Sequence, residues 1–339
     1  MIKSVRLQSF RNFKRKAWEF SEKTTVIVGP NASGKTNILE SLFLLATGKS
    51  FHARIEEEMI NYRAEIARVS AGIHDLRLEV ALTRGENGWP RKKLLVNGVS
   101  KRLIDFAGNF RMVLFGPWDL DLVTASPSLR RNFLDTVLAQ VDREYRRASL
   151  SYEKGLRQRN KLLLRIRDEG LSRSQLLFWN QLLIKNGDYL STKREEFIEF
   201  ANSQSGFNDQ EFQLEYDKSA ISETRLEQYA EEEVAAATTL VGPHRDDFIF
   251  KTEKRDLARF GSRGEQRMAI LWLKLAELAF IEERVGEKPT LLLDDILSEL
   301  DHEHREVVFA IIKKGGQVII TTADEHFLKG LKNSDIIKL

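Results

Sequence analysis

The chain has 339 residues, enough for about two structural units at the usual domain size of about 150 residues. Its 42% hydrophobic and 30% charged residues are typical of a globular protein and exclude disordered and collagen-like classes. The absence of cysteine excludes a disulfide scaffold, a thiol nucleophile and a thiolate metal site. No apolar run approaches the length of about 18 residues that a membrane span requires, and the N-terminus lacks the apolar core of a signal peptide. We therefore expect a cytoplasmic protein without membrane contact.

The first third of the sequence predicts an α/β layer. Short apolar or alternating runs indicate strands, and a longer apolar run directly after a glycine-rich loop indicates a buried helix. The predicted strands cover residues 5–7, 25–28, 77–82 and 93–96, and the predicted helix covers residues 38–46. Asn97-Gly98 after the last of these strands predicts a tight turn.

Residues 117–236 predict a helical region, because Arg, Leu, Glu and Gln dominate with helical spacing and few turn residues. The net charge of +3 conceals an uneven charge distribution there. Residues 143–167 contain nine basic and two acidic residues, whereas residues 222–235 contain five acidic residues and one basic residue. Such blocks are either solvated faces of separate helices or binding surfaces.

The last third returns to the α/β pattern. A strand is predicted at residues 247–251, an apolar helix at 266–282, and two buried strands of the parallel-sheet type at 290–293 and 317–321. We therefore predict an α/β fold with a split lobe I, formed by residues 1–116 and 239–339. A mainly helical lobe II, residues 117–238, is predicted to be inserted into it.

The strongest motif is Gly29-Pro30-Asn31-Ala32-Ser33-Gly34-Lys35-Thr36, which matches G-x-x-x-x-G-K-[ST] between a predicted strand and a predicted helix. In such a loop, backbone N–H groups face the nucleotide phosphates and the helix N-terminus adds positive potential. Lys35 is expected to reach the β and γ phosphates, and the Thr36 hydroxyl to hold Mg²⁺. A chance glycine turn is the alternative, and the strand–helix context disfavours it.

The second motif is Leu291-Leu292-Leu293-Asp294-Asp295, an apolar strand that ends in two acids. A carboxylate at this position can lie beside the phosphate loop, where Asp294 would hold Mg²⁺ and Asp295 would orient or deprotonate the attacking water. An ordinary strand-to-loop junction is the alternative for this motif alone. The following Ser298-Glu299-Leu300-Asp301 and the phosphate loop favour the functional interpretation.

Lys35 and Asp294 are 259 positions apart, so a large insertion must separate elements that meet in the sheet. This separation favours an ABC-type ATPase and predicts a third motif, a Ser-Gly loop before a helix. The loop Gly261-Ser262-Arg263-Gly264 fits, and a plain helix cap is its equally good alternative. His244, in the turn-rich segment 241–247, has no second histidine at helical spacing, so we expect no metal site there.

On these residues the chain resembles the RecF family of bacterial DNA replication and repair proteins, relatives of the SMC-type ABC ATPases. The resemblance runs nearly end to end, and its most specific parts are Gly242-Pro243-His244-Arg245-Asp246-Asp247 and the later Ser262-Arg263-Gly264. It also covers L-x-x-F-R-N-F at residues 7–13, the phosphate loop through Asn37, and the segments 48–51, 115–122, 130–135 and 291–301.

The resemblance implies an ABC-type ATPase head, a P-loop NTPase with two lobes, that dimerises on ATP and clamps duplex DNA or single-strand/double-strand junctions. It implies slow, DNA-stimulated ATP hydrolysis, cooperation with RecO and RecR type mediator proteins, recombinase loading and support of the SOS response. It also implies nucleotide contacts by Arg11 and Asn37. Ser262, Arg263 and Gly264 would complete the site from the other subunit, with Lys35 and Asp295 as catalytic residues.

The chain departs from the family pattern at several points. Glu265-Gln266 stands where the family has Gln-Gln, which puts a negative charge near a phosphate. Pro117-Trp118-Asp119-Leu120 stands where the family has Pro-Glu-Asp-Leu. The strand 318–321 is followed by Thr322-Ala323-Asp324 without the histidine of transporter ATPases, and no Q-loop glutamine is evident.

The basic block is the first candidate for DNA binding, because Lys and Arg neutralise phosphates independently of base sequence. Few aromatic residues lie within it, which favours duplex backbone contact over base stacking. A solvated face is the alternative. The candidate residues are Arg143, Arg146, Arg147, Arg157, Lys161 and Arg165.

Two functions of different class remain open at this stage. The first is a slow ATPase whose nucleotide cycle opens and closes a DNA clamp. The second is a nucleotide-gated module that recruits proteins and hydrolyses ATP negligibly, which Glu265 and the missing histidine favour. A small-molecule kinase is disfavoured, because the chain has no acceptor-site signature.

Overall fold

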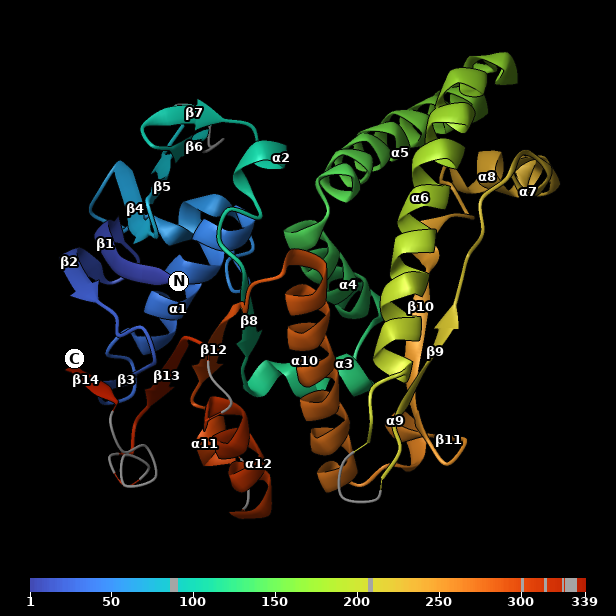
Figure 1. The fold of residues 1–339 in the computed structure, drawn as a ribbon. Helices are drawn as coiled ribbons and strands as arrows, with labels where there is room; N and C mark the ends of the chain where they lie inside the picture. The colour runs from blue at the N-terminus through green and yellow to red at the C-terminus, as the bar shows by residue number, and fades with distance from the viewer. Residues whose placement is uncertain (86–90, 207–209, 300–301, 314–315, 325, 327–333) are drawn as a thin grey trace. The chain divides into compact units, whose positions relative to one another are not determined.

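In the computed structural model, Met1–Asp119 and Glu277–Leu339 form one compact unit, and Leu120–Ala276 forms a second (Figure 1). The structure describes residues 1–85, 91–206, 210–299, 302–313, 316–324, 326 and 334–339. The predicted division at 116/117 lies close to the division at 119/120, whereas the predicted division at 238/239 lies well before 276/277. Residues 239–276 thus cluster with the middle segment. The functional lobe boundaries stay a prediction.

A parallel sheet of five strands, in the order β14-β3-β13-β12-β8, carries both nucleotide motifs of the first unit. The strands β3, β8, β12 and β13 are short, largely apolar and buried, as expected for strands covered on both faces, whereas the edge strand β14 is largely exposed. The strands are β3 (Thr24–Val28), β8 (Met112–Phe115), β12 (Thr290–Asp294), β13 (Val318–Thr322) and β14 (Asp335–Lys338). Because β13 pairs with both β3 and β12, the two motif-bearing strands are separated by one strand only.

The second sheet of this unit is antiparallel, with six strands in the order β2-β1-β4-β5-β6-β7. The Asn97-Gly98 turn is confirmed, since Val96 pairs with Val99 and both turn residues have positive φ. The strands are β1 (Ile2–Phe10), β2 (Phe13–Glu19), β4 (Ile66–Ile73), β5 (Leu76–Thr83), β6 (Arg91–Val96) and β7 (Val99–Lys101).

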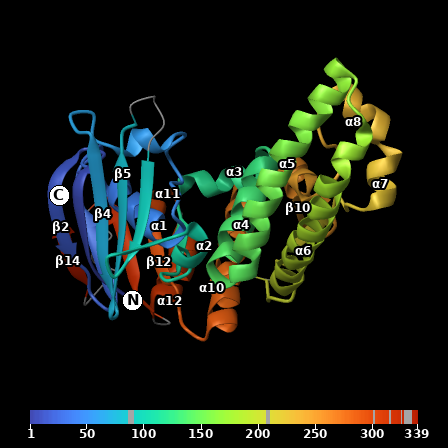
Figure 2. The same ribbon diagram turned by 90° about the horizontal axis from the view of Figure 1, so that it is seen from above.

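Helix α1 (Lys35–Thr47) contacts strands of both sheets, and Figure 2 shows it between them. This position explains why its sequence is apolar on nearly every side rather than along one stripe. The helix starts directly after the glycine-rich loop, as predicted. The other described helices of this unit are η1 (Glu56–Met59), α2 (Leu103–Phe106), α11 (Ile296–Glu299) and α12 (His302–Lys313).

The second unit is mainly helical and contains a small antiparallel sheet. Its two long helices, α5 (Arg143–Glu169) and α6 (Leu177–Asn202), pack against each other as a hairpin (Figures 1 and 2). The sheet has the order β11-β10-β9, from β9 (Gln213–Asp217), β10 (Asp247–Thr252) and β11 (Arg255–Asp256). The remaining helices of this unit are α3 (Asp121–Thr124), α4 (Pro127–Val141), η3 (Arg173–Leu176), α7 (Glu223–Gln228), α8 (Ala230–Ala236), η4 (Pro243–Arg245) and α9 (Leu257–Phe260).

Helix α10 (Arg263–Val285) begins in the second unit and ends in the first, and η2 (Pro117–Leu120) joins the two at the other crossing. α10 contains the apolar helix that the sequence predicts at 266–282. Among the described residues, no helix is both long and apolar enough to cross a membrane.

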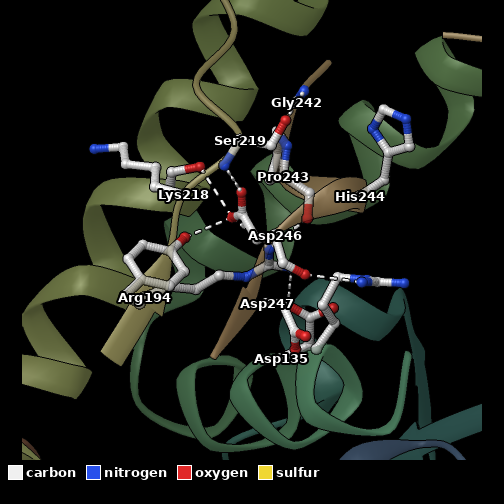
Figure 3. A network of polar contacts seen from close by, with 12 residues as sticks. Asp135, Arg194, Lys218, Ser219, Gly242, Pro243, His244, Asp246 and Asp247 are labelled. Atoms are coloured by element: carbon white, nitrogen blue, oxygen red, sulfur yellow. Dashed lines mark hydrogen bonds and ion pairs between the residues drawn. The ribbon is translucent and has the colours of Figure 1, made fainter. Parts of the chain in front are cut away.

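A buried polar network centred on Asp246 replaces part of the apolar core of the second unit (Figure 3). The Asp246 carboxylate accepts hydrogen bonds from Arg194 Nη1 at 2.9 Å, the Tyr216 hydroxyl at 2.5 Å and the Ser219 backbone N–H at 2.8 Å. Arg194 also donates to the Pro243 carbonyl at 2.7 Å. The carboxylate is fully buried, so these donors replace the water that it loses on folding.

The two charge blocks of the sequence meet at one buried ion pair. Arg159 on α5 lies 2.6 Å from Glu233 on α8, and both side chains are almost completely buried. The Arg159 guanidinium also donates to Thr239 Oγ1. This basic residue is therefore structural, whereas much of the remaining block lies on the exposed side of α5.

His244 is a neutral, partly buried residue of the second unit. Its Nε2 lies 3.0 Å from the Thr239 carbonyl oxygen, which can only accept, so Nε2 carries the proton and Nδ1 accepts from the Tyr152 hydroxyl at 2.8 Å. Burial, with the nearby Arg245 and Arg131, lowers the pKa of His244 to about 4, although its hydrogen bond to Thr239 raises it.

This shift predicts a pH-dependent stability. The unfolded chain binds a proton at His244 near pH 6.5 and the folded chain only near pH 4, so the stabilisation is complete above pH 6.5 and is lost as the pH falls toward 4. As the pH falls through that window, we expect the contribution of His244 to the free energy of unfolding to decrease by about 1.4 kcal/mol per pH unit. Urea denaturation of the wild type and His244→Gln at pH 7, 6 and 5 measures it. If the free energy of unfolding had the same dependence on pH in both proteins, the lowered pKa of His244 would be contradicted.

Candidate nucleotide site

The glycine-rich loop connects β3 to α1 and curves around the Lys35 ammonium group. Lys35 Nζ donates to the carbonyl oxygens of Gly29 at 2.7 Å and Pro30 at 3.0 Å, and the residue is 7% exposed. Beside the loop lies a cavity of about 330 Å³. Its walls are Asn31, Ala32, Gly34, Lys35, Thr36, Asn37, Pro117, Trp118, Asp294 and Asp295. The two predicted motifs therefore line one cavity.

Gly34 is required by the backbone and by its neighbours. Its φ of 105° is in the left-handed region, and a Cβ atom there would lie 2.6 Å from the Phe13 ring and 2.8 Å from the Asn12 side chain. Asn12 in turn donates to the Ser33 carbonyl at 3.1 Å and accepts from Asn37 Nδ2 at 2.9 Å. The N-terminal L-x-x-F-R-N-F segment thus holds the loop from outside.

Arg11, predicted to contact nucleotide, is engaged within the protein. Its guanidinium donates twice to the buried Glu40 of α1, at 2.7 and 2.6 Å, and once to the Glu58 carbonyl at 2.9 Å. Arg11 therefore fixes the start of β2 to the helix that follows the phosphate loop. Direct contact between Arg11 and nucleotide stays a prediction.

The remote acid and the loop threonine converge, as the separation of the motifs requires. Asp294 is 3% exposed and accepts a hydrogen bond from the Thr321 hydroxyl at 2.6 Å, and the Thr36 hydroxyl lies close enough to lower its pKa. Burial raises the pKa of Asp294, and the two threonine hydroxyls and the Lys35 ammonium lower it again. Thr36 and Asp294 thus present a hydroxyl and a carboxylate oxygen side by side.

Asp295 has the geometry of a strained functional residue. Its φ of 49° is unusual for a residue with a side chain, and its backbone N–H donates to the Thr321 carbonyl and to Thr321 Oγ1, both at 3.1 Å. One carboxylate oxygen, Oδ1, is buried without a hydrogen-bond partner. Thr321 therefore positions both acids, with one hydroxyl that donates to Asp294 and accepts from Asp295.

The residues around the cavity fit a magnesium nucleotide. Ser33 Oγ and Asp295 Oδ1 are buried without partners, and Lys35 provides a cation that neutral carbonyls hold in place. Thr36 and Asp294 supply oxygen donors of the kind that Mg²⁺ prefers, and phosphate oxygens and waters usually complete its coordination. Such a site needs no third acidic ligand, and the described part of the chain contains no group of three His, Asp or Glu side chains placed to hold a metal ion.

The Ser262 loop forms a reciprocal helix cap at the start of α10. Glu265 Oε2 accepts from the Ser262 backbone N–H at 2.7 Å, and Ser262 Oγ accepts from the Glu265 backbone N–H at 3.2 Å. These hydrogen bonds lower the pKa of Glu265. Ser262, Arg263 and Gly264 are all exposed. The structure thus shows the helix cap at Ser262, and the predicted binding of a phosphate by this loop stays a prediction.

The predicted DNA-binding residues divide into two groups on α5. Arg157, Lys161 and Arg165 are exposed and four residues apart, so they form one stripe. Arg157 and Arg165 each pair with a glutamate on the same helix, Glu153 and Glu169. The second group lies at the start of α5 and consists of Arg143, Arg146 and Arg147. Arg146 donates to the Ala139 carbonyl and Arg147 pairs with Glu144.

Three contacts in the site were not predicted from the sequence. The sequence indicates Asn12 only through the family resemblance, Thr321 only as a residue of a strand, and Trp118 only as a departure from the family pattern. Each acts through residues distant in sequence, so no local pattern indicates it. Leu300 and Asp301 of the motif after Asp295 lie outside the described residues.

Known proteins are similar to this chain over nearly its whole length. The model of the RecF/RecN/SMC N-terminal domain matches residues 1–338. A DNA replication and repair protein RecF from an Exiguobacterium species is 37% identical, over 95% of this chain and 92% of its own length. The RecF of Lachnoclostridium phytofermentans is 35% identical, over 99% and 97%.

Solved structures of other proteins have a similar fold. The recombination mediator protein RecF bound to ATP, from the RecFOR pathway, has a TM-score of 0.87 at 32% identity, over 96% of this chain and 92% of that chain. An Smc head bound to the C-terminal winged-helix domain of ScpA has a TM-score of 0.51 at 17% identity, over 97% and 91%, and supports the fold alone. The fold is therefore the ABC-type ATPase head, and the chain belongs to the RecF family within the RecF/RecN/SMC proteins.

Proposed function

We propose that this protein is an ATP-dependent DNA-binding protein of recombinational repair and replication restart. It dimerises on ATP as a clamp on duplex or gapped DNA and hydrolyses ATP slowly, with stimulation by DNA. The observation that carries the proposal is that Thr36 and Asp294 line one cavity, where the phosphate loop and the remote acid strand come together.

In the proposed reaction, the loop residues Gly29–Asn37 bind the phosphates and Lys35 turns from the loop carbonyls to the β and γ phosphates. Asp295 orients a water molecule and accepts its proton as the water oxygen bonds to the γ phosphorus. The bond from that phosphorus to the bridging oxygen breaks, which gives ADP and phosphate. Thr36 and Asp294 would hold Mg²⁺, which would supply positive charge to the phosphate oxygens.

The proposed assembly is a homodimer in which Ser262, Arg263 and Gly264 of one subunit complete the nucleotide site of the other. Support comes from the exposure of this loop at a helix N-terminus, where backbone N–H groups attract anions. We further propose that the protein acts in the cytoplasm with RecO and RecR type mediators, assists recombinase loading and supports the SOS response. The support for these partners is the RecFOR pathway named for the similar solved structure.

A second candidate function is a nucleotide-gated module that recruits proteins and hydrolyses ATP negligibly. The observation that favours it is the Glu265 carboxylate on the Ser262 N–H, since it occupies a donor that the trans site needs. Phosphate release in the presence and absence of duplex DNA separates the two candidates. Phosphate release that increases when DNA is added supports the clamp ATPase. Negligible phosphate release at saturating ATP, with or without DNA, supports the recruiting module.

The central test uses two variants of the site. Lys35→Ala removes the cation of the phosphate loop, so we expect ATP affinity to fall by at least about a hundredfold, equivalent to about 2.7 kcal/mol. Asp295→Asn keeps the shape of the side chain but not its basicity, so we expect retained binding, slow hydrolysis and a longer-lived dimer. Calorimetry measures ATP binding, and light scattering with and without ATP and Mg²⁺ measures dimerisation. An Asp295→Asn protein that binds ATP but stays monomeric would refute the dimer.

Glu265 provides a test of the trans loop. In Glu265→Gln the Ser262 N–H loses its charged partner and the loop carries one negative charge less near a γ phosphate. We expect the ATP-dependent dimer to form at about tenfold lower protein concentration, with ATP affinity of the monomer unchanged. Glu253→Gln is the matched control, because Glu253 is also close to Arg255 but lies outside the cap. A Glu265→Gln dimer no tighter than the control would exclude this role.

The basic stripe on α5 provides a test of DNA binding. Exposed ion pairs such as Arg157–Glu153 contribute little stability, so these arginines are available for phosphates. Reversing charge at Arg157, Lys161 and Arg165 should weaken duplex binding and reduce the slope of log K against log salt by about 2 to 3. Fluorescence anisotropy of a labelled duplex over a salt series measures both.

The matched control reverses three exposed basic residues of β2, Lys14, Arg15 and Lys16, for the same change in net charge. It should leave the slope unchanged. If the control flattens the slope and the α5 variant does not, the DNA surface lies on the first unit instead.

A further inference from the structure

Trp118 forms the aromatic wall of the nucleotide cavity. It lines this cavity together with Thr36, Asp294 and Asp295, among walls that otherwise consist of the phosphate loop and Pro117. Indole has one donor and no acceptor, so it cannot activate a water molecule or ligate Mg²⁺. Its large apolar surface instead excludes water from the space that it faces.

The indole is fixed by an aromatic row that leads to the helix of the phosphate loop. Its ring stacks on Phe51 at a centroid distance of 4.8 Å and an interplanar angle of 23°. Phe51 meets the ring of Phe43 on α1 edge to face, at 5.3 Å and 82°. Such contacts restrict the rotation of the ring beyond what burial alone achieves.

The backbone before Trp118 is also shaped to receive the indole. A Cβ atom on Gly116 would lie 2.6 Å from the Trp118 six-membered ring, so the indole folds back over a position that only glycine leaves open. The buried Asp119 carboxylate accepts the Gly116 backbone N–H at 2.8 Å, and the Asp119 N–H donates to the Gly116 carbonyl at 3.1 Å. Two hydrogen bonds between Gly116 and Asp119 therefore close the turn that carries Trp118.

We propose that Trp118 is a positioning residue that limits the access of water to the γ-phosphate end of bound ATP. The inference rests on the proposed function. The indole wall keeps the cavity poor in water, which strengthens the attraction between Lys35 and the phosphates and leaves few water molecules within reach of Asp295. ATP binding is thereby favoured and its hydrolysis slowed, which prolongs the ATP-bound form.

The test replaces the wall by a side chain that holds water. In Trp118→Gln, an amide of smaller volume admits and hydrogen bonds water, so we expect kcat for phosphate release to rise about fivefold or more while KM for ATP rises. Trp118→Phe retains part of the wall and should give an intermediate kcat. A purely structural role would lower kcat in both variants.

Fluorescence gives a readout that does not depend on turnover. Adding ATP with Mg²⁺ to the wild type should change the tryptophan emission, and the change should be absent in Trp118→Phe. Trp179→Phe is the matched control, since Trp179 lies on α6 and packs against Phe178 rather than in the cavity. This control should retain both the emission change and the wild-type turnover.

The outcomes separate this inference from the proposed function. If calorimetry detects no ATP binding to the wild type, the proposed function fails. If the wild type binds and hydrolyses ATP but Trp118→Gln has an unchanged or lower kcat, the positioning role is overturned alone. An emission change that persists in Trp118→Phe likewise overturns it, because the responding tryptophan is then another one.

Discussion

The two halves of the nucleotide site meet where Thr36 lies beside Asp294, which is hydrogen bonded to Thr321. Parallel strands end at the same edge of a sheet whatever their distance in sequence, and β13 lies between β3 and β12. The phosphate loop leaves this edge from β3, and the acids leave it from β12. Thr321, at the end of the intervening strand, then bonds the first acid and the backbone of the second. Strand order thus creates the site.

Burial at this edge has a cost that also selects the ligand. Desolvation disfavours the ionised form of Asp294, and the threonine hydroxyls with the Lys35 ammonium offset this only in part, since the pKa stays raised. A divalent cation beside the carboxylate would remove the remaining deficit. The unpartnered Ser33 Oγ and Asp295 Oδ1 are further groups that a ligand or water can satisfy. The buried carboxylate and the unpartnered oxygens therefore reduce the stability of the site without ligand and favour the binding of a ligand.

The sequence predicts the parts of the fold that have local patterns. The phosphate loop, the turn at Asn97-Gly98 and the strands β3, β12 and β13 of the parallel sheet follow from spacing and composition, and the structure confirms them. The other two strands of this sheet, β8 and β14, are not among the predicted elements. β2 was not predicted, because nearly all of its side chains are exposed and no alternation marks it. Thr321 and Trp118 act across the sheet and across a turn, and their partners depend on strand order. The helix cap at Ser262 was foreseen only as an alternative to the phosphate-binding loop.

The cap at Ser262 makes dimerisation, as proposed, a competition between two anions for one helix N-terminus. In the single chain, the Glu265 carboxylate satisfies the Ser262 N–H and lies 3.3 Å from Arg255. A γ phosphate that approaches from a partner must displace this carboxylate, and it carries more negative charge and more acceptor oxygens. ADP has no γ phosphate, so it leaves Glu265 without a competitor. In the proposed dimer, the internal carboxylate would therefore make closure depend on the presence of ATP rather than on nucleotide of either kind.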